Sequence, residues 1–207
     1  MAENKVKFGL KNVHIAPITA EKIDCTAEAE DAYTYGDWFK FPGAVNFTAS
    51  SKSSSSDFYA DDGVYSTTYS DNGYDITFES AKLTKEFKSK ILNEKDGRQI
   101  SSAKPVPFAI AGEISGDKEN TRFLFWHCEI TKRPDFNAKT NEDSASPQTD
   151  SFTAVAGKRA DTEDIKAEAT PDFDVYETIY TKVPKPSDFK EPTVTEPSGT
   201  ESSGQNH

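Results

Sequence analysis

Two residue pairs have side chains that could do chemistry, and neither has the surroundings that the chemistry needs. Asp61 and Asp62 could act as paired carboxylates or metal ligands, but their spacing fits no calcium-binding loop. Aspartate before Gly63 is a common turn sequence, which explains both residues. His127 and Cys128 could form a thiolate–imidazole pair, yet neighbouring residues of a strand point to opposite faces. Neither pair therefore predicts a catalytic site.

Other motifs of enzymes and metal sites are missing from the sequence. His14 and His207 have no evident partner, and the chain has no glycine-rich phosphate loop, no Gly-x-Ser-x-Gly motif and no zinc spacing. We therefore expect no enzymatic activity, no catalytic residue, no metal and no cofactor. The only cysteines, Cys25 and Cys128, form no disulfide framework, which favours reduced thiols in a cytosolic protein.

Charge and composition limit the classes of partner. The 207 residues carry 24 Lys and Arg against 35 Asp and Glu, a formal net charge of −11. An acidic chain argues against a DNA-binding surface, which would be basic, and fits a protein that repels polyanions. Aliphatic residues are few, whereas 14 Phe and 8 Tyr supply large apolar areas. This balance predicts a small aromatic-rich core with long polar loops or tails.

Signals for export or membrane insertion are missing as well. The first residues, Met1 to Lys5, lack the apolar core of a signal peptide. No apolar run approaches the roughly 18 residues that a membrane span needs. We therefore expect a protein that stays in the cytoplasm of the cell that makes it and has no membrane partner.

The stretch from Phe58 to Leu92 organises the expected fold. Residues 58–60 and 64–69 predict two strands joined by an Asp-Gly turn. A third strand follows, in which Tyr74, Ile76 and Phe78 alternate with polar residues. This alternation predicts a meander of amphipathic strands.

A helix is expected directly after the meander, over about residues 84–92. Leu83, Phe87 and Ile91 recur every four residues and form an apolar packing stripe on one side of it. Thr84 can cap its first turn. The stripe should cover the sheet that the strands form.

Alternation along the rest of the chain predicts further strands. They fall at residues 6–15, where Pro17 ends the strand, and at 44–49, 105–114, 121–131, 151–156 and 175–181. The total of seven to nine strands with one helix is mainly β. We expect a β-sandwich or barrel-like sheet with one flanking α-helix and a long extended loop.

That loop is the polar stretch of residues 19–42, interpreted as a loop or hairpin arm that leaves the core. It ends in five aromatic residues that need burial, namely Tyr33, Tyr35, Trp38, Phe39 and Phe41. Either they fold back on the same subunit, or they form a self-association arm that docks on a neighbour.

The C-terminal end differs in composition from the rest of the chain. Residues 184–207 are rich in Pro, Ser, Thr and Glu, a composition that cannot bury a core. We therefore expect one β domain over residues 1–183 and a flexible tail over residues 184–207.

Several short runs between residues 5 and 160 match one known family in their order and spacing. They are Lys5–Ile18, Phe41–Ala44, Phe58–Gly63 followed by Gly73 and Tyr74, Ala81–Leu92, Pro107–Ile110, and Lys132–Pro134 followed by Ala138 to Thr140. Together they resemble the major tail protein family of long non-contractile-tailed phages of Gram-positive bacteria.

The resemblance implies a tail tube protein of the virion, made in the cytoplasm of the bacterial host. Such subunits form rings, commonly hexameric, that stack into a hollow tube around a tape measure protein. Tail terminator and distal tail proteins are the further partners that it implies. The subunit of this family is similar to a β-sandwich flanked by a helix, and DNA passes through the tube without specific binding.

An acidic lumen would let DNA slide, because cationic side chains would bind phosphate. Asp75 and Glu79, on the polar face of the strand at 74–79, are therefore lumen candidates. The alternative function is a soluble β-sandwich module that binds a carbohydrate or a host surface, with aromatic rings stacked on sugars.

Overall fold

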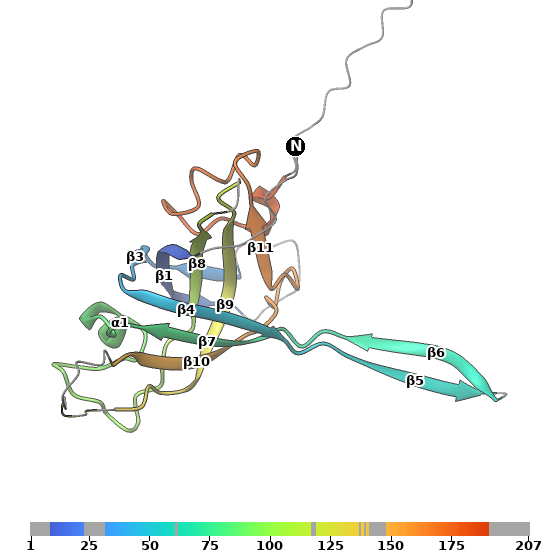
Figure 1. Cartoon of the computed structure of the whole chain (residues 1–207), viewed down its shortest axis with the longest axis horizontal. Helices are drawn as coiled ribbons and strands as arrows, with labels where there is room; N and C mark the ends of the chain where they lie inside the picture. Colours follow the sequence, from blue (N-terminus) through green and yellow to red (C-terminus); the bar gives the residue numbers. More distant parts are fainter. Residues whose placement is uncertain are drawn as a thin grey trace, which may run out of the picture.

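The structure is a computed structural model that describes residues 9–22, 32–60, 62–116, 119–136, 138, 140 and 148–190. It is mainly β, as the sequence predicted, with nine strands in one antiparallel sheet and two in a separate hairpin (Figure 1). The elements are β1 Leu10–Glu21, β2 Tyr33–Tyr35, β3 Phe39–Lys40, β4 Ala44–Ser51, β5 Ser54–Ala60, β6 Gly63–Ser70, β7 Tyr74–Ser80, α1 Lys85–Lys90, β8 Phe108–Ile114, β9 Arg122–Lys132, β10 Asp150–Ala156, β11 Lys166–Ala169 and the short 3-10 helix η1 Pro186–Asp188.

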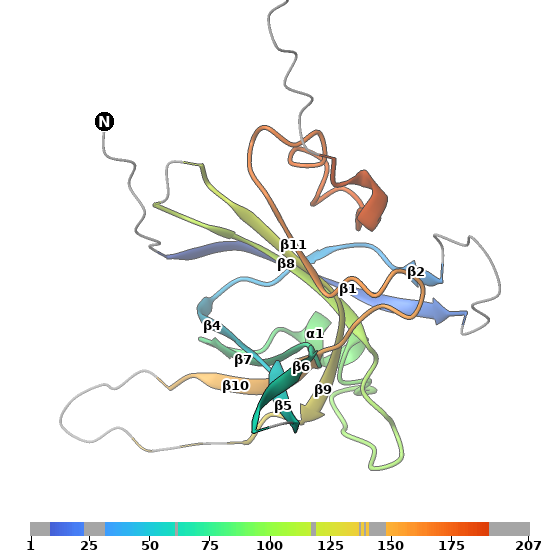
Figure 2. The same cartoon turned by 90° about the vertical axis from the view of Figure 1, so that its right-hand side faces the viewer.

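The large sheet curves around the main hydrophobic core. Its order is β2-β1-β8-β9-β10-β7-β4, with β3 also paired to β1 and β11 also paired to β9. The long strand β9 belongs to both halves, since β11 pairs with its first residues and β10 with its last. Figure 2 shows the two halves as layers, with β1 and β8 on one side and β4, β7 and β10 on the other.

The segment from β3 to β4 joins the two ends of the sheet. β3 pairs with β1, and β4, which begins a few residues later, pairs with β7. Between them the backbone N–H of Phe41 donates to the carbonyl of Val13 at 2.8 Å. One short piece of chain therefore links both layers and turns the sheet into a barrel-like sandwich.

Phenylalanine rings fill the space between the layers. The ring of Phe152 stacks on Phe78 and on Phe87, with centroid distances of 5.2 and 4.9 Å. Phe41 meets Phe78 and Phe87 edge-on at 5.1 and 5.3 Å. Offset and edge-to-face ring pairs stabilise a core beyond the area that they bury. The aromatic-rich core is thus the one that the composition predicted.

The helix lies where its sequence pattern placed it. Thr84 is the N-cap, and its hydroxyl accepts a hydrogen bond from the Phe87 N–H at 3.1 Å. Leu83, Phe87 and Ile91 are all buried in the main core, so the prediction of the packing stripe is confirmed.

Two strand predictions are wrong. β1 continues through Pro17 to Glu21, because the proline needs no N–H there and its carbonyl accepts from Gly36 at 2.8 Å. Residues 175–181 are consecutive turns rather than a strand, with Thr178 N–H bonded to the Val175 carbonyl at 3.1 Å.

The first residues of the expected tail are packed against the sheet. Trp126 Nε1 donates to the Pro184 carbonyl at 2.8 Å, and the Phe189 ring lies edge-on to Trp126 at 5.5 Å. The prediction that a flexible tail begins at Pro184 is therefore wrong for its first seven residues. Residues 191–207 lie outside the described residues.

The stripe yields a test of the core. Phe87→Ala should lower the free energy of unfolding by about 3–5 kcal/mol, because it removes a fully buried ring and leaves a cavity. Ser89→Ala, exposed on the same helix, should change it by no more than about 0.5 kcal/mol. Urea unfolding followed by circular dichroism measures both, and equal effects of the two substitutions would contradict this packing.

Candidate functional site

The outward face of β4, β7 and β10 is a polar surface, which we call the polar sheet face. The strand register sets its residues side by side in rows across the three strands. They are Asn46, Thr48, Ser50, Asp75, Thr77, Glu79, Ser151, Thr153 and Val155. Hydroxyl and amide groups dominate this face, while the residues between them point into the core.

Carboxylates are the main charged groups of the polar sheet face. Asp75 and Glu79 lie on it, and Glu129 of β9 joins them because it pairs with Val155. Asp75 is exposed and forms an ion pair of 3.3 Å with Lys52, and Glu79 accepts a hydrogen bond from the Thr149 hydroxyl. The predicted wet-face position of Asp75 and Glu79 is confirmed, and their role in a lumen stays a prediction.

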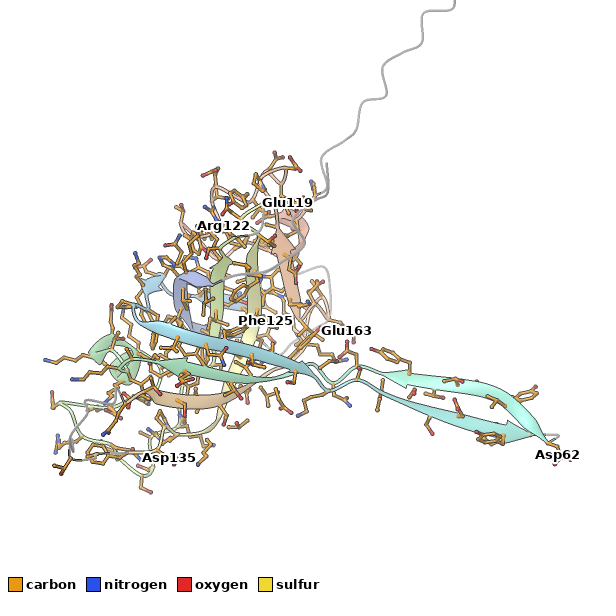
Figure 3. All side chains as sticks on the ribbon, viewed as in Figure 1. Asp62, Glu119, Arg122, Phe125, Asp135 and Glu163 are labelled. Atoms are coloured by element: carbon orange, nitrogen blue, oxygen red, sulfur yellow. The ribbon has the colours of Figure 1, made fainter. Side chains whose placement is uncertain are left out.

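The hairpin of β5 and β6 extends away from the body of the protein, and Asp62 lies at its tip (Figures 1 and 3). Between 56% and 73% of each large apolar side chain on it is exposed. These side chains are Phe58, Tyr59, Val64, Tyr65 and Tyr69. The prediction that these strands lie in the sheet under the helix is wrong, because among the described strands β5 and β6 pair only with each other and form a separate two-stranded sheet.

The two faces of the hairpin carry different aromatic residues. Phe58 and Tyr65 form a pair with centroids 6.4 Å apart, and the register puts Phe58 opposite Ser66. Tyr59 and Tyr69 project from the other face, on which Asp57 accepts a hydrogen bond from Thr67 at 2.7 Å. The hairpin therefore exposes apolar surface on both sides.

The five aromatic residues of the expected arm pack within their own subunit. Tyr33, Phe39 and Phe41 are buried, and the half-buried Tyr35 and Trp38 pack on a second cluster around Trp126. Residues 33–41 therefore do not leave the core, because β2 and β3 pair with β1. Residues 23–31 of the same stretch, including Cys25, lie outside the described residues.

A buried ion pair holds β2 against the loop that follows β10. Arg159 donates from Nε and Nη2 to the two carboxylate oxygens of Asp161 at 2.9 and 2.6 Å, and from Nη1 to the Tyr35 hydroxyl at 2.9 Å. Its guanidinium also lies 4.9 Å from the centre of the Tyr33 ring. Bidentate pairing of this kind is among the stronger polar contacts in proteins.

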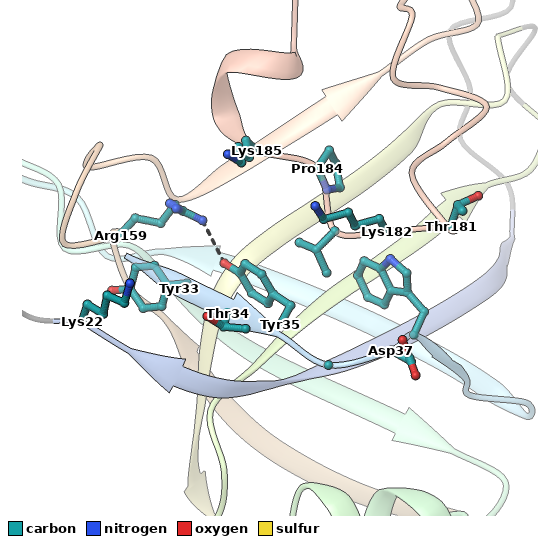
Figure 4. Close-up of a pocket in the computed structure, with 13 residues that line it drawn as sticks. Lys22, Tyr33, Thr34, Tyr35, Asp37, Arg159, Thr181, Lys182, Pro184 and Lys185 are labelled. Atoms are coloured by element: carbon teal, nitrogen blue, oxygen red, sulfur yellow. Dashed lines mark hydrogen bonds between the residues drawn. The ribbon is translucent and has the colours of Figure 1, made fainter. Parts of the chain in front are cut away.

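A cavity of about 600 Å³ lies beside this ion pair, and three lysines, Lys22, Lys182 and Lys185, line it with Asp37 (Figure 4). Burial raises the pKa of Tyr35, so its phenol stays protonated at neutral pH. Because Asp161 compensates the charge of Arg159, neither group is set up as a nucleophile or a base. We interpret the ion pair beside this cavity as a structural contact.

The structure places the histidines and the described cysteine that were considered for catalysis in separate environments. Cys128 is fully buried among apolar side chains, and burial raises its thiol pKa well above the usual range. The His127 ring lies beside Glu129, with Nε2 3.6 Å from a carboxylate oxygen of that residue. The His14 ring packs on Tyr180 with centroids 4.5 Å apart. Asp61 lies outside the described residues.

The described ranges contain neither a candidate metal centre nor a candidate membrane helix. No group of three or more His, Cys, Asp and Glu residues there could hold a metal ion. Within the same ranges, no helix is long and apolar enough to cross a membrane.

Comparisons with known proteins add no assignment. No model of a protein family matches the chain, and no curated protein matches its sequence.

The Arg159–Asp161 pair yields a stability prediction. Asp161→Asn should lower the free energy of unfolding by about 3 kcal/mol, because it leaves a buried guanidinium without its counter-charge. The matched control is Asp172→Asn, at an exposed position, which should have little effect. Chemical unfolding of the three proteins at neutral pH measures the difference, and a loss no larger than that of the control would contradict it.

The same pair should also give a pH dependence. Burial alone would raise the pKa of Asp161, but its hydrogen bonds and ion pair with Arg159 outweigh this and hold the pKa below its ordinary value. Its stabilising effect is then complete above the unfolded-state pKa of about 3.9 and is lost as the pH falls through the lower folded-state pKa. Thermal unfolding measured between neutral and acidic pH should show this loss of stability in the wild type but not in Asp161→Asn.

Proposed function

We propose that this protein is a structural subunit that assembles with copies of itself into stacked rings, forming the tail tube of a phage with a long non-contractile tail. DNA passes through the tube during ejection without specific binding. The single observation that carries the proposal is the hairpin of β5 and β6, whose apolar side chains are exposed on both faces.

Such a hairpin needs a partner. A two-stranded hairpin alone is marginally stable in water, and its outer backbone edges can pair with another chain. Its five large apolar residues together form a surface of the kind that marks a protein–protein contact. An ordinary surface loop would gain nothing from exposing so many aromatic residues.

Copies of the same chain are the partners that fit best. The hairpin and the body are different surfaces, so a contact between them is heterologous and repeats from one subunit to the next. Repetition of such a contact gives closed rings or open filaments, the two arrangements that a stacked-ring tube combines. The mainly β fold with one flanking helix and the motif order of the tail tube family support the same conclusion.

The polar sheet face is the surface that suits the inside of the tube. It is rich in hydroxyl groups, and the carboxylates of Asp75, Glu79 and Glu129 outnumber its lysines, which are Lys132, paired with Thr153, and Lys52, ion-paired with Asp75. Cationic side chains would bind phosphates and hold the DNA, whereas carboxylates repel it. In this proposal the subunit works in the virion tail, next to a tape measure protein and between tail terminator and distal tail proteins.

The hairpin tests the proposal. Replacing Phe58 and Tyr65 by Ser should prevent polymerisation and leave the monomer as stable as the wild type, because neither residue packs on the body. Each anchor of this kind contributes about 2 kcal/mol to a contact, or about thirtyfold in affinity. The matched control, Ser56→Ala with Thr68→Ala on the same face, should polymerise normally.

Sedimentation of concentrated protein measures the polymer, and thermal unfolding measures the monomer. Polymer formed by the Phe58 and Tyr65 variant at the wild-type yield would count against the hairpin as the assembly element.

The lumen assignment has a separate test. Phages that carry Asp75→Lys and Glu79→Lys should assemble tails and eject DNA more slowly, since the new cations bind phosphate in the channel. The neutral pair Asp75→Asn and Glu79→Gln is the control for lost side-chain contacts. Ejection is followed by the release of dye-accessible DNA, and an unchanged rate in the lysine variant would place the polar sheet face outside the channel.

A carbohydrate- or host-surface-binding module is the second candidate, because the hairpin exposes tyrosines that could stack on sugars. Its aromatic residues lie on both faces of a thin ribbon rather than in one concave platform, which favours protein contacts. A monomer that binds a glycan array through the hairpin and never polymerises would support this alternative.

A further inference from the structure

A groove with aromatic walls opens between β4 and β11, on the body of the protein. Its volume is about 450 Å³, within the usual range of ligand pockets. The rings of Phe47 and Phe123 stack in its wall with centroids 4.9 Å apart, and Tyr74 and Phe125, which is labelled in Figure 3, complete the wall. Phe123 and Phe125 are buried in the main core, whereas Phe47 and Tyr74 are half-buried and can be reached from the groove. Val45, at the mouth on β4, is 54% exposed.

Both strands that border the groove have a free edge. Among the described strands, β4 pairs only with β7 and β11 pairs only with β9. Free edges next to exposed apolar surface are the places where a strand of another chain can add to a sheet. The groove thus offers both backbone hydrogen-bonding groups and rings to a β-structured partner.

We propose that this groove receives the β5–β6 hairpin of a second copy of the chain, with the Phe58 and Tyr65 rings seated against its aromatic wall. The inference rests on the proposed function, and it names the surface on which the hairpin docks.

The properties of the two surfaces match. The hairpin presents a pair of aromatic rings on strands that consist largely of serine and threonine. The groove presents aromatic rings between two strand edges. Asp62 at the tip of the hairpin is acidic, while Lys166 lies at the rim of the groove. Lys166 is ion-paired with Glu168 at 3.1 Å, so its contribution is to orientation more than to affinity.

The hairpin of the same subunit cannot fill the groove. β5 follows β4 after two residues. The Lys52 N–H donates to the Gly73 carbonyl at 2.8 Å, and this hydrogen bond joins the two sides of the hairpin at its base. From there β5 and β6 extend away from the body (Figure 1). A neighbouring subunit must therefore supply the occupant, and each subunit gives one hairpin and receives another.

Disulfide trapping tests the contact. Two full-length proteins are made in a Cys25→Ser background, one with Ser66→Cys on the ring-pair face of the hairpin and one with Val45→Cys at the mouth of the groove. Neither substitution removes an aromatic anchor, and native Cys128 is buried. The two proteins are mixed, concentrated until they polymerise and oxidised. We expect a mixed dimer on a non-reducing gel.

The matched control replaces the groove partner by Phe136→Cys, at a side chain that is 95% exposed and distant from the groove in sequence. The Ser66→Cys and Val45→Cys mixture should cross-link several-fold more than the control mixture. Tubes seen by electron microscopy with equal or no cross-linking would overturn the groove as the docking surface and leave the proposed function standing. A chain that stays monomeric at all concentrations and forms no cross-link would overturn both.

Discussion

The structure depends on the burial of phenylalanine rings between the two ends of one curved sheet. Aliphatic residues are scarce in this chain, and stacked and edge-on rings around Phe87 and Phe152 lie at the centre of the packing between the layers. The β3–β4 segment carries Phe41 into that cluster and pairs with both ends of the sheet. This closure sets the outward direction of the polar sheet face and leaves β4 with a free edge. It also starts the hairpin at the end of β4, pointing away from the body.

Two sets of aromatic residues therefore have different roles. One set stabilises the subunit, and it includes the residues that the sequence first suggested as a docking arm. The other set lies on the hairpin and is exposed, and the groove between β4 and β11, lined by half-buried Phe47 and Tyr74, is the complementary surface. In the proposed tube both exposed surfaces become buried, while the acidic polar sheet face stays in contact with water and with passing DNA. The folded core and the assembly would then use the same kind of side chain for separate contacts.

Sequence reasoning found the elements whose signals are local. Thr84 and the residues Leu83, Phe87 and Ile91 predicted the helix and its buried stripe, and the Asp-Gly turn predicted the hairpin. It failed where pairing between distant segments decides the outcome. β2 and β3 join β1 across a polar stretch, β11 has only four residues, and no local pattern places the hairpin outside the sheet. Free edges and the groove likewise depend on which strands end up side by side. The aromatic residues of β5 and β6 are evident in the sequence, but their exposure to solvent could be learned only from the structure.

Electron cryomicroscopy of the concentrated wild-type protein is the most direct measurement of the central claim. The account predicts hollow tubes of stacked rings, with the hairpin of each subunit covered by a neighbour and Asp75 and Glu79 facing the channel. Particles that remain single subunits, or a tube in which the hairpins point freely into solvent, would contradict it.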